Sequence, residues 1–540
     1  MPCRFLITLA LQAAFFTTAA PAGAPIISLD GGTFTGVAVG STESFLGIPF
    51  AKPPVGNLRY RLPQANAPYQ GSYDATSFGP SCPQKSTGIP VLTGLSSRAA
   101  EAVVNSVYGE ISPDAEDFTP RSQGGFDSGG PTIYDGTVIV ARSITLGTPV
   151  IYVSMNYRYP YAASMILERE FTFLRGFGFL PGKEVKAAGV GNLGLQDQRQ
   201  AFRWVQKYIT QFGGDPTKVT IWGESAGAIS VSLHMVANGG NTEGLFRAAF
   251  MQSGAPIPVG DIANGQESYD ALVNDTGCSD ASDTLACLRT VPYGALKGAI
   301  DRSPRLFDYQ PLRLSWLPRT DGVFLTDNPQ RLLQQGKVAN IPYVTGNCDD
   351  EGTLFSLSAL NVTTESQLKA YVKTIFLPEA TNEEIEELAI LYPGDITKGS
   401  PFDTGVLNAI TPQFKRIAAF QGDGVFQAPR RWMLQNTLPF NPNVWVFLSK
   451  RLKFLPVLGS VHASDILNVY GGGELTNYLI HFAANLDPNG ESGFQWPKYA
   501  LGSRQILTFL DGLVPLTITS DTYREASMNY LINTTLTYPV

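Results

Sequence analysis

Apolar runs of two kinds alternate through the middle of the chain. Pro149 to Met155 (PVIYVSM) is a short apolar run with β-branched residues, which is typical of a strand buried on both faces of a parallel sheet. From Gln196 to Phe212 the apolar positions recur every three or four residues instead, which predicts an amphipathic helix. The turn Gly213 to Pro216 ends this helix.

The alternation of strand and helix continues further along the chain. We predict strands at Val219–Trp222, Ile341–Thr345 and Val444–Leu448, and a helix at Ala226–Val236. This order favours an α/β fold, with a large, mostly parallel central sheet covered by helices on both faces. No repeat or linker divides residues 25–540, so we expect a single domain. In such sheets the chemistry lies at the carboxyl ends of the strands.

The composition excludes several classes of protein. Of the 540 residues, 44% are hydrophobic and only 16% are charged, whereas about 25% are charged in typical domains. A disordered chain or a coiled coil would need many more charges. The net charge is −7 and no run of five basic residues occurs, so nucleic-acid binding and binding to anionic membranes have no electrostatic support.

The first 24 residues are typical of a secretory signal peptide. Arg4 supplies a positive charge, and Phe5–Phe16 is an apolar run too short to cross a bilayer. Small residues at Ala20, Ala22 and Ala24 then offer cleavage sites. A buried N-terminal helix is the alternative. No later apolar run is long enough to span a membrane, so we expect a secreted, extracellular protein without integral membrane association. Three N-glycosylation sequons agree with secretion: Asn274, Asn361 and Asn533.

The cysteines also fit an oxidising compartment. Of the five cysteines, Cys3 lies in the expected signal peptide, and the remaining four allow three pairings. Cys278 and Cys287 are close enough in sequence to close a small loop, whereas Cys82 and Cys348 have no obvious partners. No CxxC motif or Cys/His cluster is present, so we expect no metal site.

The most informative stretch is a G-x-S-x-G pentapeptide at Gly223–Gly227. A predicted strand precedes it and a predicted helix follows it, which is the context that a serine nucleophile needs. We expect the two glycines to permit a sharp, strained turn that presents Ser225 Oγ. The N–H groups at the start of the helix would then face an oxyanion. The alternative is a tight turn without chemistry.

A serine nucleophile needs a base, and the chain has three histidines. His234 lies nine residues after Ser225 on the same predicted helix, a rise of roughly 13 Å, so it cannot reach the serine. His481 lies in a helical apolar stretch and is interpreted as structural. His462 is in a small-residue loop (GSVHAS) after the predicted strand at Val444–Leu448. It is therefore the predicted base.

The base in turn needs an acid to orient it. Asp349, Asp350 and Glu351 follow the predicted strand that ends near Thr345, and all three are possible by position. We expect at least one of them to lie in a solvated turn. The order serine, acid, histidine is that of the α/β-hydrolases.

Further motifs accompany these residues and cover almost the whole chain after the signal peptide. They are FLGIPFAKPP at Phe45–Pro54, GNLGLQDQR at Gly191–Arg199, FGGDP at Phe212–Pro216, VTIWGESAGAISV at Val219–Val231, DDEGTLFS at Asp349–Ser356 and GSVH at Gly459–His462. With them the chain resembles the fungal secreted lipases of the type-B carboxylesterase family, which includes the cholinesterases.

The resemblance implies an α/β-hydrolase fold and a secreted serine hydrolase that cleaves carboxylic esters. It implies that Glu351 is the acid of the triad, with Ser225 and His462. The N–H groups of Gly124, Gly125 and Ala226 would form the oxyanion hole, and Cys278 and Cys287 would form a disulfide. Catalysis in the family needs no cofactor.

The sequence departs from the family pattern in two places. The family carries two strands between its SED-Cys motif and its oxyanion loop, whereas here only six residues separate Asp117 from Gly124. Roughly two dozen residues are absent by comparison, enough for two strands. The first glycine of the loop is replaced by Gln123, and a segment from Tyr159 to Arg175 is inserted. We interpret both as errors of a gene model. Genuine divergence is the alternative.

The segment 83–115 bears on the substrate. Leu95, Ala99, Val103 and Val107 recur every four residues and predict a short amphipathic helix. It is either a surface helix packed on the core or, as the resemblance implies, a lid that opens at an oil–water interface. A lid favours a triacylglycerol lipase with a lipid substrate over a carboxylesterase or sterol esterase. An inactive binding protein is a further alternative, which the survival of all three triad positions disfavours.

Overall fold

The computed structural model describes residues 23–79, 134–157 and 177–539. Several features expected from the sequence lie outside these ranges. They are the signal peptide up to residue 22, the lid at 83–115, Cys82, Gly124, Gly125 and the insertion 159–175.

Among the described residues, a six-stranded sheet forms the centre of the molecule, with strand order β11-β10-β9-β8-β7-β6. Its strands are β6 (Thr220–Glu224), β7 (Ala248–Gln252), β8 (Tyr343–Cys348), β9 (Val444–Ser449), β10 (Gln505–Phe509) and β11 (Leu516–Ser520). All neighbouring pairs from β6 to β10 are parallel, and only β10 and β11 pair antiparallel. The predicted mostly parallel sheet is therefore confirmed.

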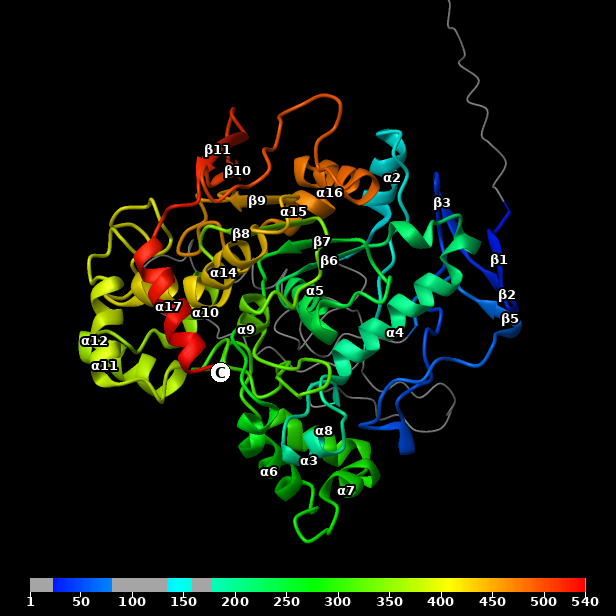
Figure 1. Ribbon diagram of the computed structural model, residues 1–540, viewed down its shortest axis with the longest axis horizontal. Helices are drawn as coiled ribbons and strands as arrows, with labels where there is room; N and C mark the ends of the chain where they lie inside the picture. Colours follow the sequence, from blue (N-terminus) through cyan, green and yellow to red (C-terminus); the bar gives the residue numbers. More distant parts are fainter. Residues whose placement is uncertain (1–22, 80–133, 158–176, 540) are drawn as a thin grey trace, which may run out of the picture.

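Helices cover both faces of this sheet. Figure 1 shows α4 (Leu193–Tyr208) and α5 (Ala226–Val236) on one side, and α15 (Ile466–Tyr470) and α16 (Glu474–Asn485) on the other. Every residue of β7, β8 and β9 is buried, as strands covered on both faces must be. The layered arrangement places the carboxyl ends of the parallel strands at one edge of the sheet.

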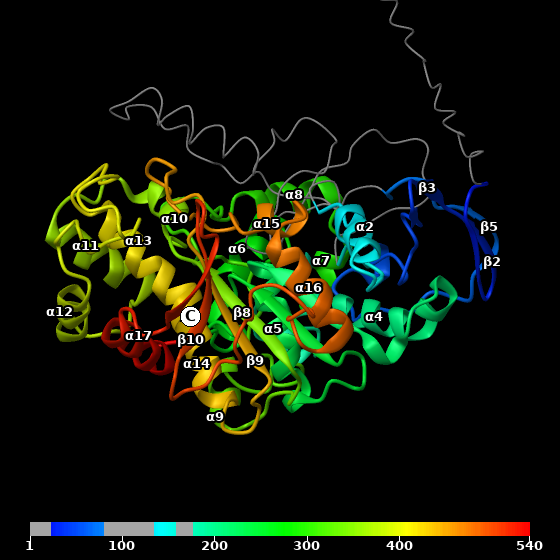
Figure 2. The same cartoon turned by 90° about the horizontal axis from the view of Figure 1, so that it is seen from above.

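The remaining elements surround this centre. Figure 2 shows α11, α12 and α17 at one end of the molecule and the small sheet β1-β2-β5 at the other. The small strands are β1 (Ile26–Leu29), β2 (Gly31–Thr35), β3 (Val37–Val39), β4 (Thr42–Ser44) and β5 (Gln70–Asp74). The other α-helices are α2 (Thr137–Thr145), α3 (Lys183–Ala187), α6 (Gln266–Asp275), α7 (Thr284–Thr290), α8 (Tyr293–Asp301), α9 (Pro329–Gln334), α10 (Thr353–Ser356), α11 (Glu365–Tyr371), α12 (Asn382–Leu391), α13 (Phe414–Gly422), α14 (Ala428–Thr437) and α17 (Glu525–Thr537).

The two helices predicted from the sequence are confirmed, whereas one predicted strand is not. The helix predicted at Ala226–Val236 has those bounds, and the one predicted at Gln196–Phe212 is α4 with a 3-10 turn after it. The strand predicted at Pro149–Met155 is wrong, because this segment belongs to no strand. Its sequence favours a strand, but a strand needs a hydrogen-bonded neighbour, and cavities adjoin the segment.

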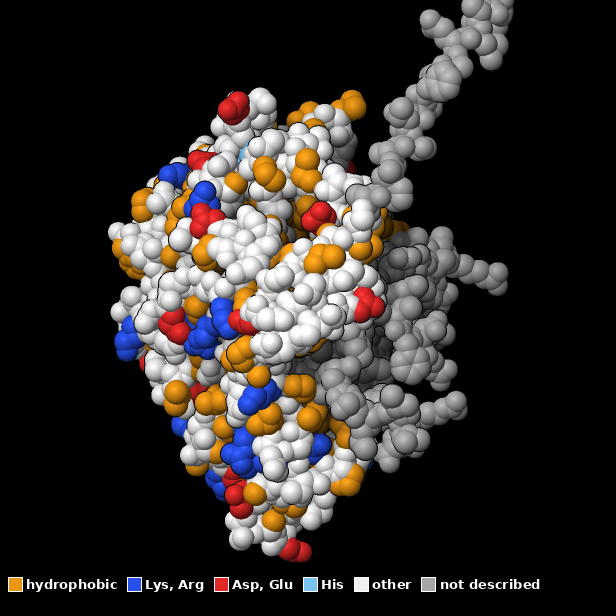
Figure 3. Space-filling model, turned by 90° about the vertical axis from the view of Figure 1, so that its right-hand side faces the viewer, with side chains coloured by type: hydrophobic (Ala, Val, Ile, Leu, Met, Phe, Trp, Pro, Cys, Tyr) orange, Lys and Arg blue, Asp and Glu red, His pale blue; other side chains and the backbone are white. Residues whose placement is uncertain are grey.

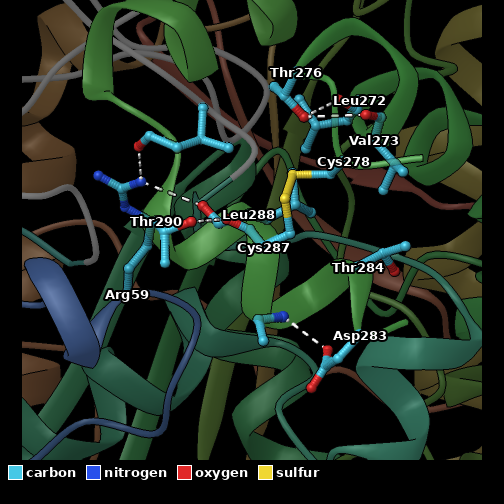
Figure 4. The surroundings of a disulfide bond; sticks show 12 residues. Arg59, Leu272, Val273, Thr276, Cys278, Asp283, Thr284, Cys287, Leu288 and Thr290 are labelled. Carbon is cyan, nitrogen blue, oxygen red and sulfur yellow. Dashed lines mark hydrogen bonds between the residues drawn. A yellow bond between two sulfur atoms is a disulfide. The ribbon is translucent and has the colours of Figure 1, made fainter. Parts of the chain in front are cut away.

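The region around α6 and α7 is held by a disulfide between Cys278 and Cys287 (Figure 4). Asp283 caps α7 by accepting a hydrogen bond from the Ala286 N–H at 2.8 Å. Arg59 reaches into this region from the N-terminal part of the chain and donates to the Val291 carbonyl at 2.6 Å. The disulfide between Cys278 and Cys287 that the family resemblance implies is therefore confirmed.

The surface carries mixed charges. On the face drawn in Figure 3, Lys and Arg side chains lie interspersed with Asp and Glu side chains. Among the described residues, no helix is both long and apolar enough to cross a membrane.

Candidate active site

Ser225 lies at the turn between β6 and α5. Its backbone has φ 53° and ψ −123°, a region that a residue with a side chain rarely adopts and that stores strain. The Ser225 N–H donates to the Gln252 carbonyl of β7 at 2.8 Å, which anchors the turn to the sheet. The turn places Ser225 at the wall of a cavity of about 670 Å³.

The two glycines of the pentapeptide differ in how much room their surroundings leave for a side chain. A Cβ added to Gly223 would lie 2.3 Å from the Gly227 carbonyl carbon, so a side chain at this position would push the helix off the strand. A Cβ added to Gly227 meets no described atom within 4 Å. The expectation that both glycines serve the turn therefore holds for Gly223 alone, and Gly227 borders the cavity instead.

His462 lies within hydrogen-bond distance of Ser225. Its Nε2 is 2.7 Å from Ser225 Oγ, and its Nδ1 is 2.5 Å from Glu351 Oε2. The ring packs against Phe426, with centroids 4.5 Å apart, and against Phe355 at 5.3 Å. These contacts leave the imidazole few alternative orientations, so its two nitrogens face the hydroxyl and the carboxylate.

The carboxylate oxygen of Glu351 that does not face His462 accepts hydrogen bonds from its own loop. Glu351 Oε1 accepts hydrogen bonds from the Cys348 N–H at 2.8 Å and from Asn347 Nδ2 at 3.2 Å. Asn347 is held in turn by Arg430, whose Nε donates to Asn347 Oδ1 at 2.7 Å. The following Gly352 leaves no room for a side chain, since an added Cβ would lie 1.9 Å from the Ala418 carbonyl oxygen.

The other two acidic residues of this loop point away from His462. Asp350 accepts from the Ser460 N–H at 2.8 Å and from Lys453 Nζ at 2.6 Å. Asp349 forms an ion pair with the same lysine at 2.5 Å. All three acids are buried. The expectation that one of them lies in a solvated turn is wrong, because Lys453 pairs with both aspartates and Lys450 pairs with Asp349 inside the fold.

Two further carboxyl groups lie near the imidazole. Glu224 Oε1 is 3.6 Å from His462 Nε2, and it has no hydrogen-bond partner among the described residues. Asp465 accepts from Gln252 Nε2 at 2.9 Å through Oδ2, while its Oδ1 likewise has no described partner. Both carboxyl groups are buried.

These groups shift one another's pKa values. Burial raises the pKa of Glu224 to about 8 and that of Asp465 to about 6. Burial by itself disfavours the imidazolium form of His462. The Glu351 carboxylate opposes this, with smaller contributions from Glu224 and Asp465, and the pKa of the imidazole is raised to about 9.

Sequence reasoning did not single out Glu224 or Asp465. A signal was present for both, because Glu224 is the second residue of the pentapeptide and Asp465 lies three residues after His462. An acidic residue at either position, next to a predicted serine or base, could have been flagged as a group that acts on the imidazole.

The other two histidines take no part in this arrangement. His234 is buried on α5, with its Nε2 2.9 Å from Gln198 Oε1, and burial holds its pKa well below the usual range. His234 is therefore a core histidine. His481 is partly buried on α16, away from the carboxyl ends of the strands.

Of the three expected oxyanion donors, only Ala226 lies within the described ranges. It is the first residue of α5, so its N–H is one of those left without an intrahelical partner at a helix N-terminus. The positive end of the helix dipole adds to the attraction for an anion there. Gly124 and Gly125 lie outside the described residues.

The family model described as "Carboxylesterase family" matches residues 23–529. The chain belongs to the carboxylesterase family. It is a carboxylic ester hydrolase, with the α/β-hydrolase fold that the resemblance implies.

Fungal lipases are similar to this carboxylesterase over most of its length. Lipase 5 of Diutina rugosa is 42% identical, over 92% of this chain and 93% of its own. The secreted triacylglycerol lipase LIP1 of Gibberella zeae is 37% identical, over 94% of this chain and 89% of its own. The crystal structure of Aspergillus niger EstA superposes with a TM-score of 0.75 and 25% identity, covering 95% of this chain and 99% of that one.

Proposed function

We propose that this carboxylesterase is a secreted triacylglycerol lipase that acts through a covalent acyl-enzyme on Ser225. The observation that supports this most strongly is the unbroken hydrogen-bonded chain from Ser225 Oγ through His462 to Glu351. A nucleophile, a base within reach of its proton and an acid that orients the base are what acyl transfer requires.

In the first half of the reaction, His462 Nε2 takes the hydroxyl proton as Ser225 Oγ attacks the ester carbonyl carbon. The tetrahedral intermediate carries a negative charge on the former carbonyl oxygen. The Ala226 N–H donates to this oxygen, together with Gly124 and Gly125 if the family resemblance holds. Removing one such donor typically costs about 3–4 kcal/mol of transition-state stabilisation.

The intermediate collapses when His462 returns the proton to the leaving alcohol. Water then attacks the acyl-enzyme with His462 again acting as base, and the fatty acid leaves. Throughout, the Glu351 carboxylate holds the imidazole in the tautomer that has a proton on Nδ1, and it stabilises the imidazolium.

The substrate class and the location are argued from the relatives and from the surface. Relatives named secreted lipase and secreted triacylglycerol lipase match nearly the whole chain. Asn274, Asn361 and Asn533 are all exposed, as glycosylation of a secreted protein requires. Both arguments favour an extracellular enzyme with a lipid ester as substrate.

Hydrolysis of p-nitrophenyl butyrate and of trioleoylglycerol tests the proposal. Replacing Ser225 or His462 by alanine should lower the rate by roughly 10⁴-fold or more. The matched control is His234→Gln, because His234 lies on the same helix as the serine but outside the hydrogen-bonded chain, and its replacement should leave the rate unchanged. Hydrolysis that survives in Ser225→Ala would contradict the assignment of the nucleophile.

A further inference from the structure

The hydrogen bonds that hold Glu351 continue past Asn347 into the interior of the protein. Asn347 lies in β8, and its side-chain amide joins two groups. Its Nδ2 donates to Glu351 Oε1 at 3.2 Å, and its Oδ1 accepts from Arg430 Nε at 2.7 Å. Arg430 lies on α14. All three side chains are buried, so these two neighbours decide how the amide is oriented.

Only one of the two orientations of the Asn347 amide suits both neighbours. A guanidinium can only donate hydrogen bonds, and a carboxylate can only accept them. The reversed amide would set its NH₂ group against the guanidinium of Arg430 and its oxygen against the carboxylate of Glu351. Each buried group would then lose its partner. Arg430 therefore turns Asn347 Nδ2 toward the acid.

This orientation decides which oxygen Glu351 offers to the base. Oε1 accepts from Asn347 and, at 2.8 Å, from the Cys348 N–H. Oε2 is the oxygen that faces His462 Nδ1, at 2.5 Å. Because the imidazole must at the same time present Nε2 to Ser225, a rotation of the carboxylate would disturb the hydrogen bond that orients the base.

Arg430 is itself held by an ion pair that uses both of its terminal nitrogens. Nη1 and Nη2 donate to the two carboxylate oxygens of Asp521, each at 2.9 Å. With the fork of the guanidinium engaged in this way, Nε is the nitrogen that remains for Asn347. A lysine has one terminal nitrogen, so it could pair with Asp521 but could not hold Asn347 in the same geometry.

The next residue, Arg431, provides a comparison within the same cluster. It is also buried, and its Nε and Nη2 donate to Asp521 Oδ1 at 3.0 Å and 2.9 Å. Its Nη1 has no hydrogen-bond partner among the described residues. The two arginines therefore share one counter-ion, but only Arg430 continues the hydrogen bonds toward Asn347.

Arg430 has a second connection to the active site, through its own helical segment. Phe426 precedes it in this segment and packs against the His462 ring, with centroids 4.5 Å apart. Gln427 Nε2 donates to the Cys348 carbonyl at 3.0 Å. A general displacement of the segment would therefore act on the base without involving the acid, and an experiment must separate the two routes.

We propose that Arg430 is a positioning residue of the catalytic acid, which orients the Asn347 amide so that Glu351 presents Oε2 to His462. Asp521 anchors Arg430, and Arg431 shares this anchor without taking part in the positioning. The inference rests on the proposed function, because it takes Glu351 as the acid of the triad.

Arg430→Lys and Arg431→Lys form the first test. Both variants keep a cation beside Asp521, but only the first loses the hydrogen bond to Asn347. Hydrolysis of p-nitrophenyl butyrate is measured per active site, with the sites counted by titration with a p-nitrophenyl phosphonate, so that unfolded protein does not contribute. Arg430→Lys should lower kcat roughly tenfold or more with little change in KM. Arg431→Lys should change neither, and equal losses in the two variants would overturn the proposal.

A double-mutant cycle with Glu351→Ala separates the two routes. If Arg430 acts through the acid, Arg430→Lys should leave kcat nearly unchanged once Glu351 is absent. The same loss in both backgrounds would show that Arg430 acts through the helix and Phe426, and it would overturn the proposal while leaving the triad intact. Full activity of Glu351→Ala by itself would contradict the triad, and with it this inference.

Asn347→Asp tests the amide without touching the arginines. The aspartate keeps an acceptor for Arg430 but turns a second acceptor toward Glu351, so kcat per active site should fall roughly tenfold or more. The control is Asn441→Asp. Asn441 is also buried, and its amide donates to the Ile341 carbonyl at 2.6 Å, at the opposite end of the strands. It should lose stability but not kcat. An unchanged kcat in Asn347→Asp would overturn the proposal.

Discussion

Asp350 Oδ2 accepts a hydrogen bond from the Ser460 N–H at 2.8 Å, which ties the loop of Glu351 to the loop of His462. The Asp350 N–H donates in return to the Ser460 carbonyl at 3.0 Å. Gly459 makes this approach possible, because an added Cβ there would lie 2.3 Å from Asp350 Oδ2. The acid next to Glu351 therefore sets the distance between the two loops.

Replacing Asp350 by Asn is expected to lower kcat with little change in KM. The amide loses the charge that Lys453 neutralises and presents a donor where an acceptor is needed, so the loop of His462 shifts. A displacement of about 1 Å at a catalytic group can cost roughly a hundredfold in rate. Kinetics on p-nitrophenyl butyrate measures this. Asp403→Asn is the control, since Asp403 is an exposed acid that pairs with Lys450. An equal loss in both variants would contradict the positioning role.

Replacing Glu224 by Gln should move the acid limb of the pH profile to lower pH. The base must be neutral to take the serine proton, so kcat/KM rises as His462 loses its proton, and the pKa of His462 is raised to about 9. A carboxylate at Glu224 favours the imidazolium, and removing it lowers the pKa of His462.

The profile is measured as kcat/KM between pH 5 and pH 10 in both proteins. Glu243→Gln serves as control, because Glu243 pairs with Arg203 away from the site. An unchanged acid limb in Glu224→Gln, with only a lower plateau, would show that Glu224 has a structural role alone.

Asp521 is expected to stabilise the fold in a pH-dependent way. It accepts hydrogen bonds from Arg430 and Arg431 in the interior, and these cations lower the pKa of the buried carboxyl to about 2, against burial, which raises it. Because the pKa of Asp521 is lower in the folded than in the unfolded protein, its carboxylate stabilises the fold above pH 4. This stabilisation is lost as the pH falls from about 4 to about 2. The shift corresponds to about 2 kcal/mol.

Urea denaturation of the parent and of Asp521→Asn measures this contribution at several pH values. At pH 7 the variant leaves two buried cations without their carboxylate and should lose about 3–5 kcal/mol. The difference between the two proteins should shrink below pH 4. A difference that is constant down to pH 2.5 would contradict the assigned pKa.

Interfacial activation tests the role proposed for residues 83–115. If this segment is a lid, hydrolysis of a long-chain ester should rise steeply once the substrate passes its solubility limit. Replacing Val103 by Glu, on the expected apolar stripe, should remove the rise, and the rate on soluble p-nitrophenyl acetate should stay unchanged. Smooth saturation through the solubility limit would favour a carboxylesterase without a lid.

The sequence by itself determined the local parts of this protein. The pentapeptide with its helix at Ala226–Val236 and the exclusion of His234 as the base follow from short-range spacing, because a helix and a tight turn are built from neighbours in the chain. Gly223 of strand β6 lies against Gly227 of helix α5, which is only four residues further along the chain. The need for a glycine at position 223 is therefore also local. The same reasoning separated His462 from the other two histidines, since only it follows a strand on a loop.

Only the tertiary structure decided what depends on distant partners. The spacing left Asp349, Asp350 and Glu351 equivalent, and they differ because Lys453 and the Ser460 N–H engage the two aspartates. The run at Pro149–Met155 has the sequence of a strand, yet pairing requires a neighbour that no local pattern supplies. Local spacing likewise does not predict that Glu224 is buried beside the imidazole of His462, although this burial raises the pKa of Glu224.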